Sequence, residues 1–194
     1  MIEFLLSLDL SLFYFGNRTL QNPLFDFMMP FVTDLNKKPV ALVVAAILWL
    51  LLLVKGGKQG RLAALLLIPT IALGDQLNSS FLKHLFERLR PCHTLPDVHL
   101  LVSCGSGYSF PSSHAVNNFA AALVLSYFER KWTWAFFTFA GTVAFSRVYV
   151  GVHYPSDILA GAVLGLVAGL IILLLYIKTA AWLAERKARA TSEP

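Results

Sequence analysis

Long apolar runs separated by short polar segments dominate the chain. A helix needs about 20 residues to cross the hydrocarbon core of a bilayer, within a working range of roughly 17–25. Several runs approach that length, namely Val40–Val54, Leu62–Leu82, Ala115–Phe128, Trp132–Phe145 and Ile158–Ile177. The last run carries glycines at a four-residue spacing, which lets one membrane helix approach another closely. The pattern therefore predicts an all-α fold, a polytopic bundle of membrane helices.

The first forty residues form shorter apolar patterns. Ile2–Phe15 is short for a crossing, and Asn22–Thr33 is a second short helical pattern. Asn22 is a plausible helix cap and Pro23 a plausible first-turn residue. We expect six crossings, the first formed by the N-terminal helix. The alternative is five crossings, with the N-terminal helix lying in the membrane interface.

Composition agrees with a membrane protein and excludes an ordinary soluble domain. The chain is 57% hydrophobic and 14% charged, whereas soluble domains are about half apolar and about a quarter charged. The net charge of +5 does not indicate nucleic acid as a partner, because the basic residues lie in short loops between apolar runs. A length of 194 residues suits one domain spanning 1–194.

The basic loops also predict an orientation. Lysine and arginine gather in Lys55–Arg61, Glu129–Lys131 and Lys178–Arg189, and such loops face the cytoplasm in membrane proteins. The segments Arg88–Phe110 and Arg147–Tyr154 then lie on the outer side of the membrane.

Three polar clusters interrupt the apolar background. They are Lys83–Pro91 at the outer end of one run, Pro111–His114 at the start of the next, and Ser146–Asp157 between the last two. All three lie on the outer side in the orientation above, although that orientation was assigned from other loops. We therefore expect the three clusters to meet.

The clusters contain the groups that bind phosphate. Arginine can hold phosphate oxygens through two parallel hydrogen bonds, and lysine acts as a point charge. Backbone N–H groups and the dipole at the start of a helix also favour an anion. The cations are Lys83, Arg90 and Arg147, and the residues at the start of a helix are Ser112 and Ser113.

Two histidines and an aspartate add reactive groups. One histidine can attack phosphorus while the other protonates the leaving oxygen, and the candidates are His153 and His114. Asp157 follows His153 by four residues. Its carboxylate could accept a hydrogen bond from one ring nitrogen of His153, which leaves the other nitrogen free as a nucleophile.

These clusters resemble the type 2 phosphatidic acid phosphatase family, which shares its site with bacterial acid phosphatases and vanadium haloperoxidases. The first family motif, a lysine, six residues and Arg-Pro, is matched by Lys83, Arg90 and Pro91. The second, Pro-Ser-Gly-His, is matched by Pro111, Ser112 and His114, with Ser113 in place of the glycine. The third is matched in full by Ser146, Arg147, His153 and Asp157. The motifs occur in the family's order.

The resemblance implies a role for each matched residue. His153 would attack phosphorus and become a phosphohistidine, and Asp157 would orient it. His114 would be the general acid for the leaving group and then the base that activates water. The phosphate oxygens would be held by Lys83, Arg90, Ser112, Arg147 and the backbone N–H of Ser113. The family's phosphatases require no metal, and we expect no cofactor.

The resemblance also implies an activity and a location. The chain would hydrolyse a phosphate monoester or diphosphate of a lipid, such as phosphatidylglycerophosphate, phosphatidic acid, undecaprenyl diphosphate or lipid A. The enzyme would lie in a bacterial inner membrane with its site facing the periplasm or exterior. A phosphotransferase could use the same intermediate with a lipid or sugar acceptor. A non-catalytic lipid-binding or transport relative would be favoured by loss of His114 or His153, and both are present.

The outer loop contains Cys92, His93, His99 and Cys104. Their spacing matches no familiar zinc pattern, so we expect no metal there. The two cysteines lie in a compartment that permits disulfides. They form either a Cys92–Cys104 bridge or two free thiols.

Some polar residues lie outside the matched positions. A patch within the second long run is either functional or bonded between helices, and it consists of Asp75, Gln76 and Asn78. Asn117 and Asn118 follow His114 by one turn and could support it. His84, Glu87 and Arg88 occupy variable positions of the first motif, and we do not expect them to be catalytic.

Overall fold

The structure, a computed structural model, describes residues 2–192, and helices account for all the regular elements of that range. In chain order these are α1 (Ile2–Tyr14), η1 (Phe15–Thr19), α2 (Pro23–Thr33), η2 (Leu35–Lys37), α3 (Pro39–Lys55), α4 (Gly57–Asp75), η3 (Gln76–Leu82), α5 (Lys83–Phe86), α6 (Pro91–Thr94), α7 (Ser113–Phe128), η4 (Arg130–Trp132), α8 (Thr133–Tyr149) and α9 (Pro155–Ser192). The prediction of an all-α fold is confirmed.

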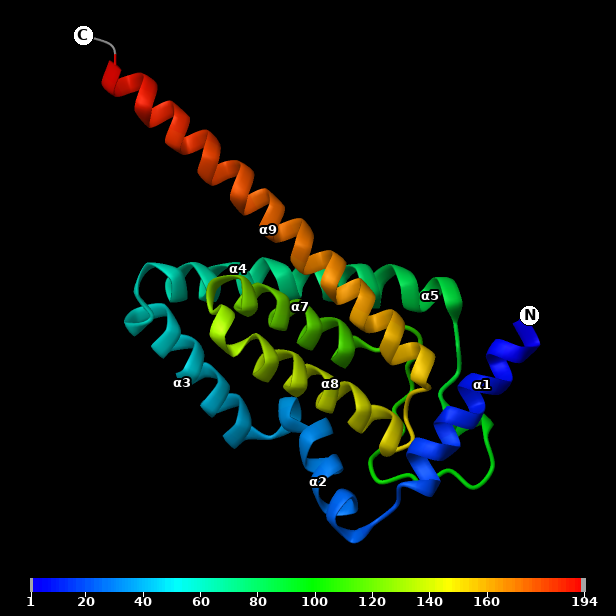
Figure 1. The fold of residues 1–194 in the computed structure, drawn as a ribbon. Coiled ribbons are helices and arrows are strands. Elements are labelled where there is room, and N and C mark those ends of the chain that lie inside the picture. Colours follow the sequence, from blue (N-terminus) through cyan, green and yellow to red (C-terminus); the bar gives the residue numbers. More distant parts are fainter. Residues whose placement is uncertain (1, 193–194) are drawn as a thin grey trace.

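Each apolar run of the sequence becomes a helix. The stretches Gly57–Thr94 and Pro155–Thr191 are long and apolar enough to cross a membrane, and α3 is a shorter apolar helix. α9 continues far beyond the predicted run, and its C-terminal part projects well past the other helices (Figure 1). The predicted run ended where the residues become polar. The residues that follow include alanine, lysine, arginine and glutamate, which all favour helix, so the helix continues.

Helix starts follow the local signals of the sequence. Asn22 precedes α2, and its side chain accepts a hydrogen bond from the backbone N–H of Phe25 at 2.9 Å. Pro23 occupies the first turn. A side-chain cap followed by proline satisfies or removes N–H groups that have no partner within a helix. The predicted cap is therefore confirmed.

α7 lies at the centre of the bundle. It packs against α4, α8 and α9, while α3 packs on α4 and α2 packs on α8 (Figure 1). The side chains of α7 that face these neighbours are small, which permits close packing. Its buried apolar residues are Ala115, Val116, Ala120, Ala122 and Val124.

Glycines bring α9 directly onto α7. A Cβ added at Gly161 would lie 2.6 Å from the carbonyl oxygen of Ser112, and one added at Gly165 would overlap the carbonyl oxygen of Val116. The predicted close approach through small residues is therefore confirmed. It places the first turn of α9 against the start of α7, where the N–H of Ser112 donates to the carbonyl of Asp157 at 3.0 Å.

The second long run is one helical rod with a change of winding. α4 leads without interruption through the π-helical segment η3 into α5. Asn78 is buried within η3. Short π-helical segments are frequent at functional sites, and this one lies immediately before the first polar cluster.

α1 lies at one end of the bundle rather than alongside it (Figure 1). It packs against η1 and the beginning of α9. Most of its apolar side chains are exposed, including Phe4, Leu5, Leu6, Leu8, Leu10 and Leu12. The expected six crossings are not confirmed by this arrangement.

Candidate active site

The three polar clusters meet at one end of the bundle, where several helices begin or end. Lys83 begins α5, and Arg90 immediately precedes α6. Ser112 precedes α7, Arg147 lies in the last turn of α8, and the turn between α8 and α9 carries His153. Asp157 lies in the first turn of α9.

His153 and Asp157 form a buried pair. Nδ1 of His153 lies 3.3 Å from Oδ2 of Asp157, which also accepts the backbone N–H of Tyr154 at 2.8 Å. On the other side of the ring, Nη1 of Arg90 lies 3.2 Å from Nε2 of His153. A guanidinium can only donate, and a carboxylate can only accept. The proton of the neutral imidazole therefore lies on Nδ1, and Nε2 carries the lone pair that faces Arg90.

Burial keeps the His153 imidazole neutral. The side chain is 2% exposed. Burial lowers the pKa of His153 well below its ordinary value, and the cations of Arg147 and Arg90 lower it further. A neutral ring retains the lone pair that a nucleophile needs.

Backbone carbonyls of the outer loop and of the turn between α8 and α9 hold two of the cations. Nε of Arg90 donates to the carbonyl of Gly107 at 2.8 Å, and its Nη1 donates to the carbonyl of Val152 at 3.2 Å. Nζ of Lys83 donates to the carbonyl of Tyr108 at 2.7 Å. The loop thus fixes both charges without neutralising them.

Several buried polar atoms of the motif residues have no partner. Arg147 is 7% exposed, and its Nη1 donates to Oγ1 of Thr33 at 2.8 Å. Within residues 2–192, Nε of Arg147, Oγ of Ser112 and Nε2 of His114 make no hydrogen bond. Unpaired buried polar groups are rare in folded proteins and call for an explanation. A bound phosphate would supply oxygens to these donors.

Ser113, which replaces the family glycine, is turned toward η3. Nδ2 of Asn78 donates to Oγ of Ser113 at 2.8 Å and to the carbonyl of Pro111 at 3.3 Å. The interpretation of Asn78 as a residue bonded between helices is therefore confirmed. The Ser113 oxygen therefore accepts a hydrogen bond from the protein, while its O–H group keeps its capacity to donate.

The outer loop is closed by a Cys92–Cys104 disulfide in the structure, with Cα atoms 6.1 Å apart. Of the other two candidate ligands, His93 lies beside this bridge, with Nε2 3.3 Å from Sγ of Cys104. His99 lies elsewhere, with Nε2 3.0 Å from Oδ1 of Asp26. The two histidines therefore lie apart and have different partners.

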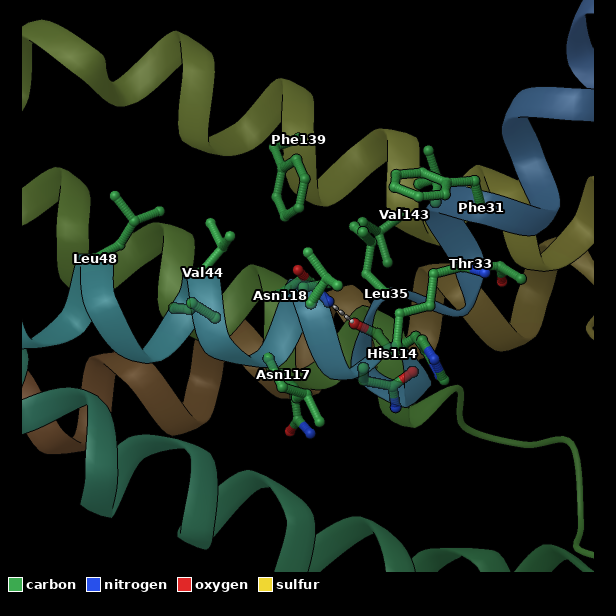
Figure 2. A pocket seen from close by; sticks show the side chains of 18 of the residues that line it. Phe31, Thr33, Leu35, Val44, Leu48, His114, Asn117, Asn118, Phe139 and Val143 are labelled. Carbon is green, nitrogen blue, oxygen red and sulfur yellow. Dashed lines mark hydrogen bonds between the residues drawn. The ribbon is translucent and has the colours of Figure 1, made fainter.

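A cavity of about 690 Å³ lies beside the site. It is open on one side and is lined by the end of α2, by α3, and by the facing sides of α7 and α8 (Figure 2). His114 lies at one end near Thr33, and apolar side chains such as Val44, Leu48 and Phe139 line the remainder (Figure 2). Asn118 also lines the cavity, and its Nδ2 donates to the backbone carbonyl of His114, one turn earlier in α7, at 2.9 Å.

Two residues of the site were not expected from the sequence. Arg88 and Asp9 both bond to the first turn of α9, and Arg88 contacts Asp157 directly. One signal for Asp9 exists in the sequence, since a carboxylate in an apolar helix is costly unless it has a partner. No sequence signal identified Arg88 beyond its place in the first motif.

A helical bundle with a buried histidine–aspartate pair, a second histidine and three cations at one end defines a membrane phosphatase. The chain belongs to the PAP2 superfamily, whose family model matches residues 61–180. It is 36% identical over 172 residues to the lipid A 4'-phosphatase of Bacteroides thetaiotaomicron, covering 85% of this chain and 75% of that protein.

Two crystal structures share the fold. Aquifex aeolicus LpxE superposes with a TM-score of 0.72 at 32% identity, covering 86% of this chain and 94% of that one. A transmembrane PAP2 type phosphatidylglycerolphosphate phosphatase from Bacillus subtilis gives 0.69 at 25% identity, covering 90% and 87%. The resemblance drawn from the three motifs is confirmed. The chain is a membrane protein with a helical fold, and it is a lipid phosphatase.

Proposed function

We propose that the chain hydrolyses a lipid phosphate through a phosphohistidine on His153. In the first step, Nε2 of His153 attacks phosphorus, the bond from phosphorus to the lipid oxygen breaks, and His114 gives that oxygen a proton. In the second step, His114 takes a proton from water, the water oxygen attacks phosphorus, and the P–N bond breaks to release phosphate. The observation that carries this proposal is the position of the His153 ring, with Nδ1 at Asp157 and Nε2 at Arg90.

Fixed positive charge would stabilise the transition state. Preorganised donors aimed at the developing charge contribute most when water is excluded. Lys83, Arg90 and Arg147 would hold the equatorial oxygens together with Ser112 and the backbone N–H of Ser113. The unpaired donors of Arg147 and Ser112 support this assignment.

The apolar cavity supports a lipid as the leaving group. His114 lines the cavity, so an oxygen that His114 protonates would belong to a molecule extending among the apolar side chains of α3 and α8. A soluble sugar phosphate would offer those apolar side chains no apolar group to contact. The likeness to a lipid A 4'-phosphatase over 85% of this chain favours a phosphate of lipid A as the substrate. A phosphotransferase would need an acceptor in place of water at the same intermediate.

We further propose that residues 1–194 act as one domain with five crossings, formed by α3, α4 with α5, α7, α8 and α9. α1 packs against η1 and the beginning of α9 rather than along the five crossing helices. Its place at the end of the bundle supports an interfacial position. With the basic loops in the cytoplasm, the site would face the periplasm from the inner membrane of a bacterium.

Purified protein should release phosphate from at least one of four lipids in detergent micelles. These are lipid A, phosphatidic acid, phosphatidylglycerophosphate and undecaprenyl diphosphate, with lipid A expected to react fastest. Activity should persist in EDTA, because cations and a helix start supply the charge that a metal would otherwise provide. Orthovanadate should inhibit by adopting a trigonal-bipyramidal form at His153. Loss of turnover in EDTA that magnesium restores would contradict the proposed site.

A membrane-impermeant thiol reagent should test the orientation. After reduction of intact cells whose outer barrier has been opened, the reagent should label Cys92 or Cys104, because the proposed topology places both outside. The same cells without reduction should show little labelling if the Cys92–Cys104 bridge is formed. Labelling that requires rupture of the inner membrane would reverse the orientation.

A further inference from the structure

Arg88 joins the catalytic aspartate to the N-terminal helix. Its Nη1 donates to Oδ1 of Asp157 at 2.8 Å, and its Nη2 donates to Oδ2 of Asp9 at 2.7 Å. The guanidinium also lies over the ring of Tyr154, 3.8 Å from the ring centroid. Its plane is thus fixed by two carboxylates and one aromatic face, although the residue lies at a variable position of the first motif.

Asp9 also accepts two hydrogen bonds from Ser156 at the start of α9. Its Oδ1 accepts the backbone N–H of Ser156 at 2.8 Å, and its Oδ2 accepts the hydroxyl of Ser156 at 2.6 Å. The Asp9 side chain is 10% exposed, and that of Arg88 is 27% exposed. α1 therefore contributes a nearly buried charge to the turn that carries His153.

We propose that Arg88 is a positioning residue for the reaction, and that Asp9 holds Arg88 in place. The inference rests on the proposed role of His153 as nucleophile. Arg88 acts through Asp157, whose two oxygens have separate duties. Oδ2 takes the His153 ring and the Tyr154 N–H, while Oδ1 takes Arg88.

The charges explain why Asp157 needs this partner. Its carboxylate has no exposed surface, and an ionised carboxylate removed from water is costly unless it is paired and hydrogen-bonded. Arg88 supplies the charge and fixes the rotation of the carboxylate, because a planar guanidinium stacked on an aromatic ring has little freedom. Asp9 provides the second anion that prevents Arg88 from turning away.

This arrangement makes α1 a part of the active site. A helix that served only to attach the chain to the membrane would not need a carboxylate at this position. Arg88 contacts neither the attacking Nε2 of His153 nor the cations assigned to phosphate. Its loss should therefore slow the chemical step and leave substrate binding nearly unchanged.

The test compares four variants with wild-type protein on the panel lipid that the wild type hydrolyses fastest. Arg88→Gln should lower kcat by about 10–100-fold, as loss of the hydrogen-bonding partner behind a metal ligand does in metalloenzymes, with KM within about threefold. Arg88→Lys should recover part of kcat, because lysine keeps the charge but not the forked geometry. Asp9→Asn should lower kcat by about 3–10-fold, and should add little in an Asp9→Asn/Arg88→Gln double variant, because residues of one network couple.

Arg18→Gln provides the matched control. Arg18 also forms an ion pair between the N-terminal segment and the outer loop, with Nη1 3.7 Å from Oδ2 of Asp97, but that pair is exposed. The kcat of the Arg18→Gln variant should equal that of the wild type. The folded fraction of every variant is measured by size exclusion, and inhibition by inorganic phosphate reports whether the cation site is intact.

Three outcomes separate the explanations. Unchanged kcat in folded Arg88→Gln protein would overturn the positioning role, and full kcat in Arg88→Lys protein would overturn the part assigned to the planar guanidinium. Additive losses for Asp9→Asn and Arg88→Gln would overturn the link through α1. If instead His153→Ala kept normal turnover, or the wild type hydrolysed no lipid phosphate, the proposed function itself would fail, and this inference with it.

Discussion

Replacing His153 by alanine is expected to abolish hydrolysis, with a loss of about 10⁴-fold or more in kcat, comparable to removal of the nucleophile in other covalent enzymes. The variant loses the one ring nitrogen whose lone pair faces a fixed cation, at 3.2 Å from Nη1 of Arg90. The phosphate-binding cations and the cavity remain. Binding of lipid phosphate should therefore persist while turnover disappears, and initial rates of phosphate release measure the loss.

A companion variant shows where the phosphoryl group goes. p-Nitrophenyl phosphate labelled with ³²P has a leaving group that needs no proton, so His114→Ala protein should still transfer phosphoryl to His153. The phosphoenzyme should then accumulate, because the base that activates water is missing. An alkaline quench preserves phosphohistidine for detection. Label retained by His153→Ala, or near-normal turnover of that variant, would exclude His153 as the nucleophile.

Hydropathy predicted the helices of the bundle well because each one must bury an apolar surface or expose it to lipid. The run Ala115–Phe128 became α7 at Ser113–Phe128, and Val40–Val54 became α3 at Pro39–Lys55. The end of α9 was missed because hydropathy does not record helix formed by charged residues. The position of α1 could not be predicted from the sequence either, because a short apolar helix has the same sequence pattern in the interface as across the membrane.

The site was predictable where a motif sets the spacing and less so where a contact joins distant segments. Lys83, Arg90 and His153 were assigned from spacing, and the structure brings them to one end of the bundle. The contact between Arg88 and Asp9 spans 79 residues. It depends on how α1 packs, and no local pattern records that packing.

Asp157→Asn is expected to lower kcat by about 10³–10⁴-fold in a folded protein, as other enzymes lose activity when the carboxylate orienting a histidine becomes an amide. The amide oxygen would be drawn to the cationic Nη1 of Arg88, which donates to Oδ1 of Asp157 at 2.8 Å, and away from the neutral N–H of Tyr154, which donates to Oδ2. The amide NH₂ would then face Nδ1 of His153 and force that nitrogen to accept. The ring proton would move to Nε2, which removes the lone pair that attacks phosphorus.

A second aspartate of the same protein provides the control for this loss. Asp26 also holds a histidine, with Oδ1 3.0 Å from Nε2 of His99, and it accepts the hydroxyl of Tyr149 at 2.6 Å, but these partners have no role assigned in the reaction. Asp26→Asn should keep kcat within about threefold of the wild type, in the range of ordinary substitutions away from a reacting group. KM should change little in either variant, because neither aspartate is assigned to phosphate. If Asp157→Asn protein also kept kcat within that range, the tautomer of His153 would not depend on the carboxylate, and the nucleophile would need another explanation.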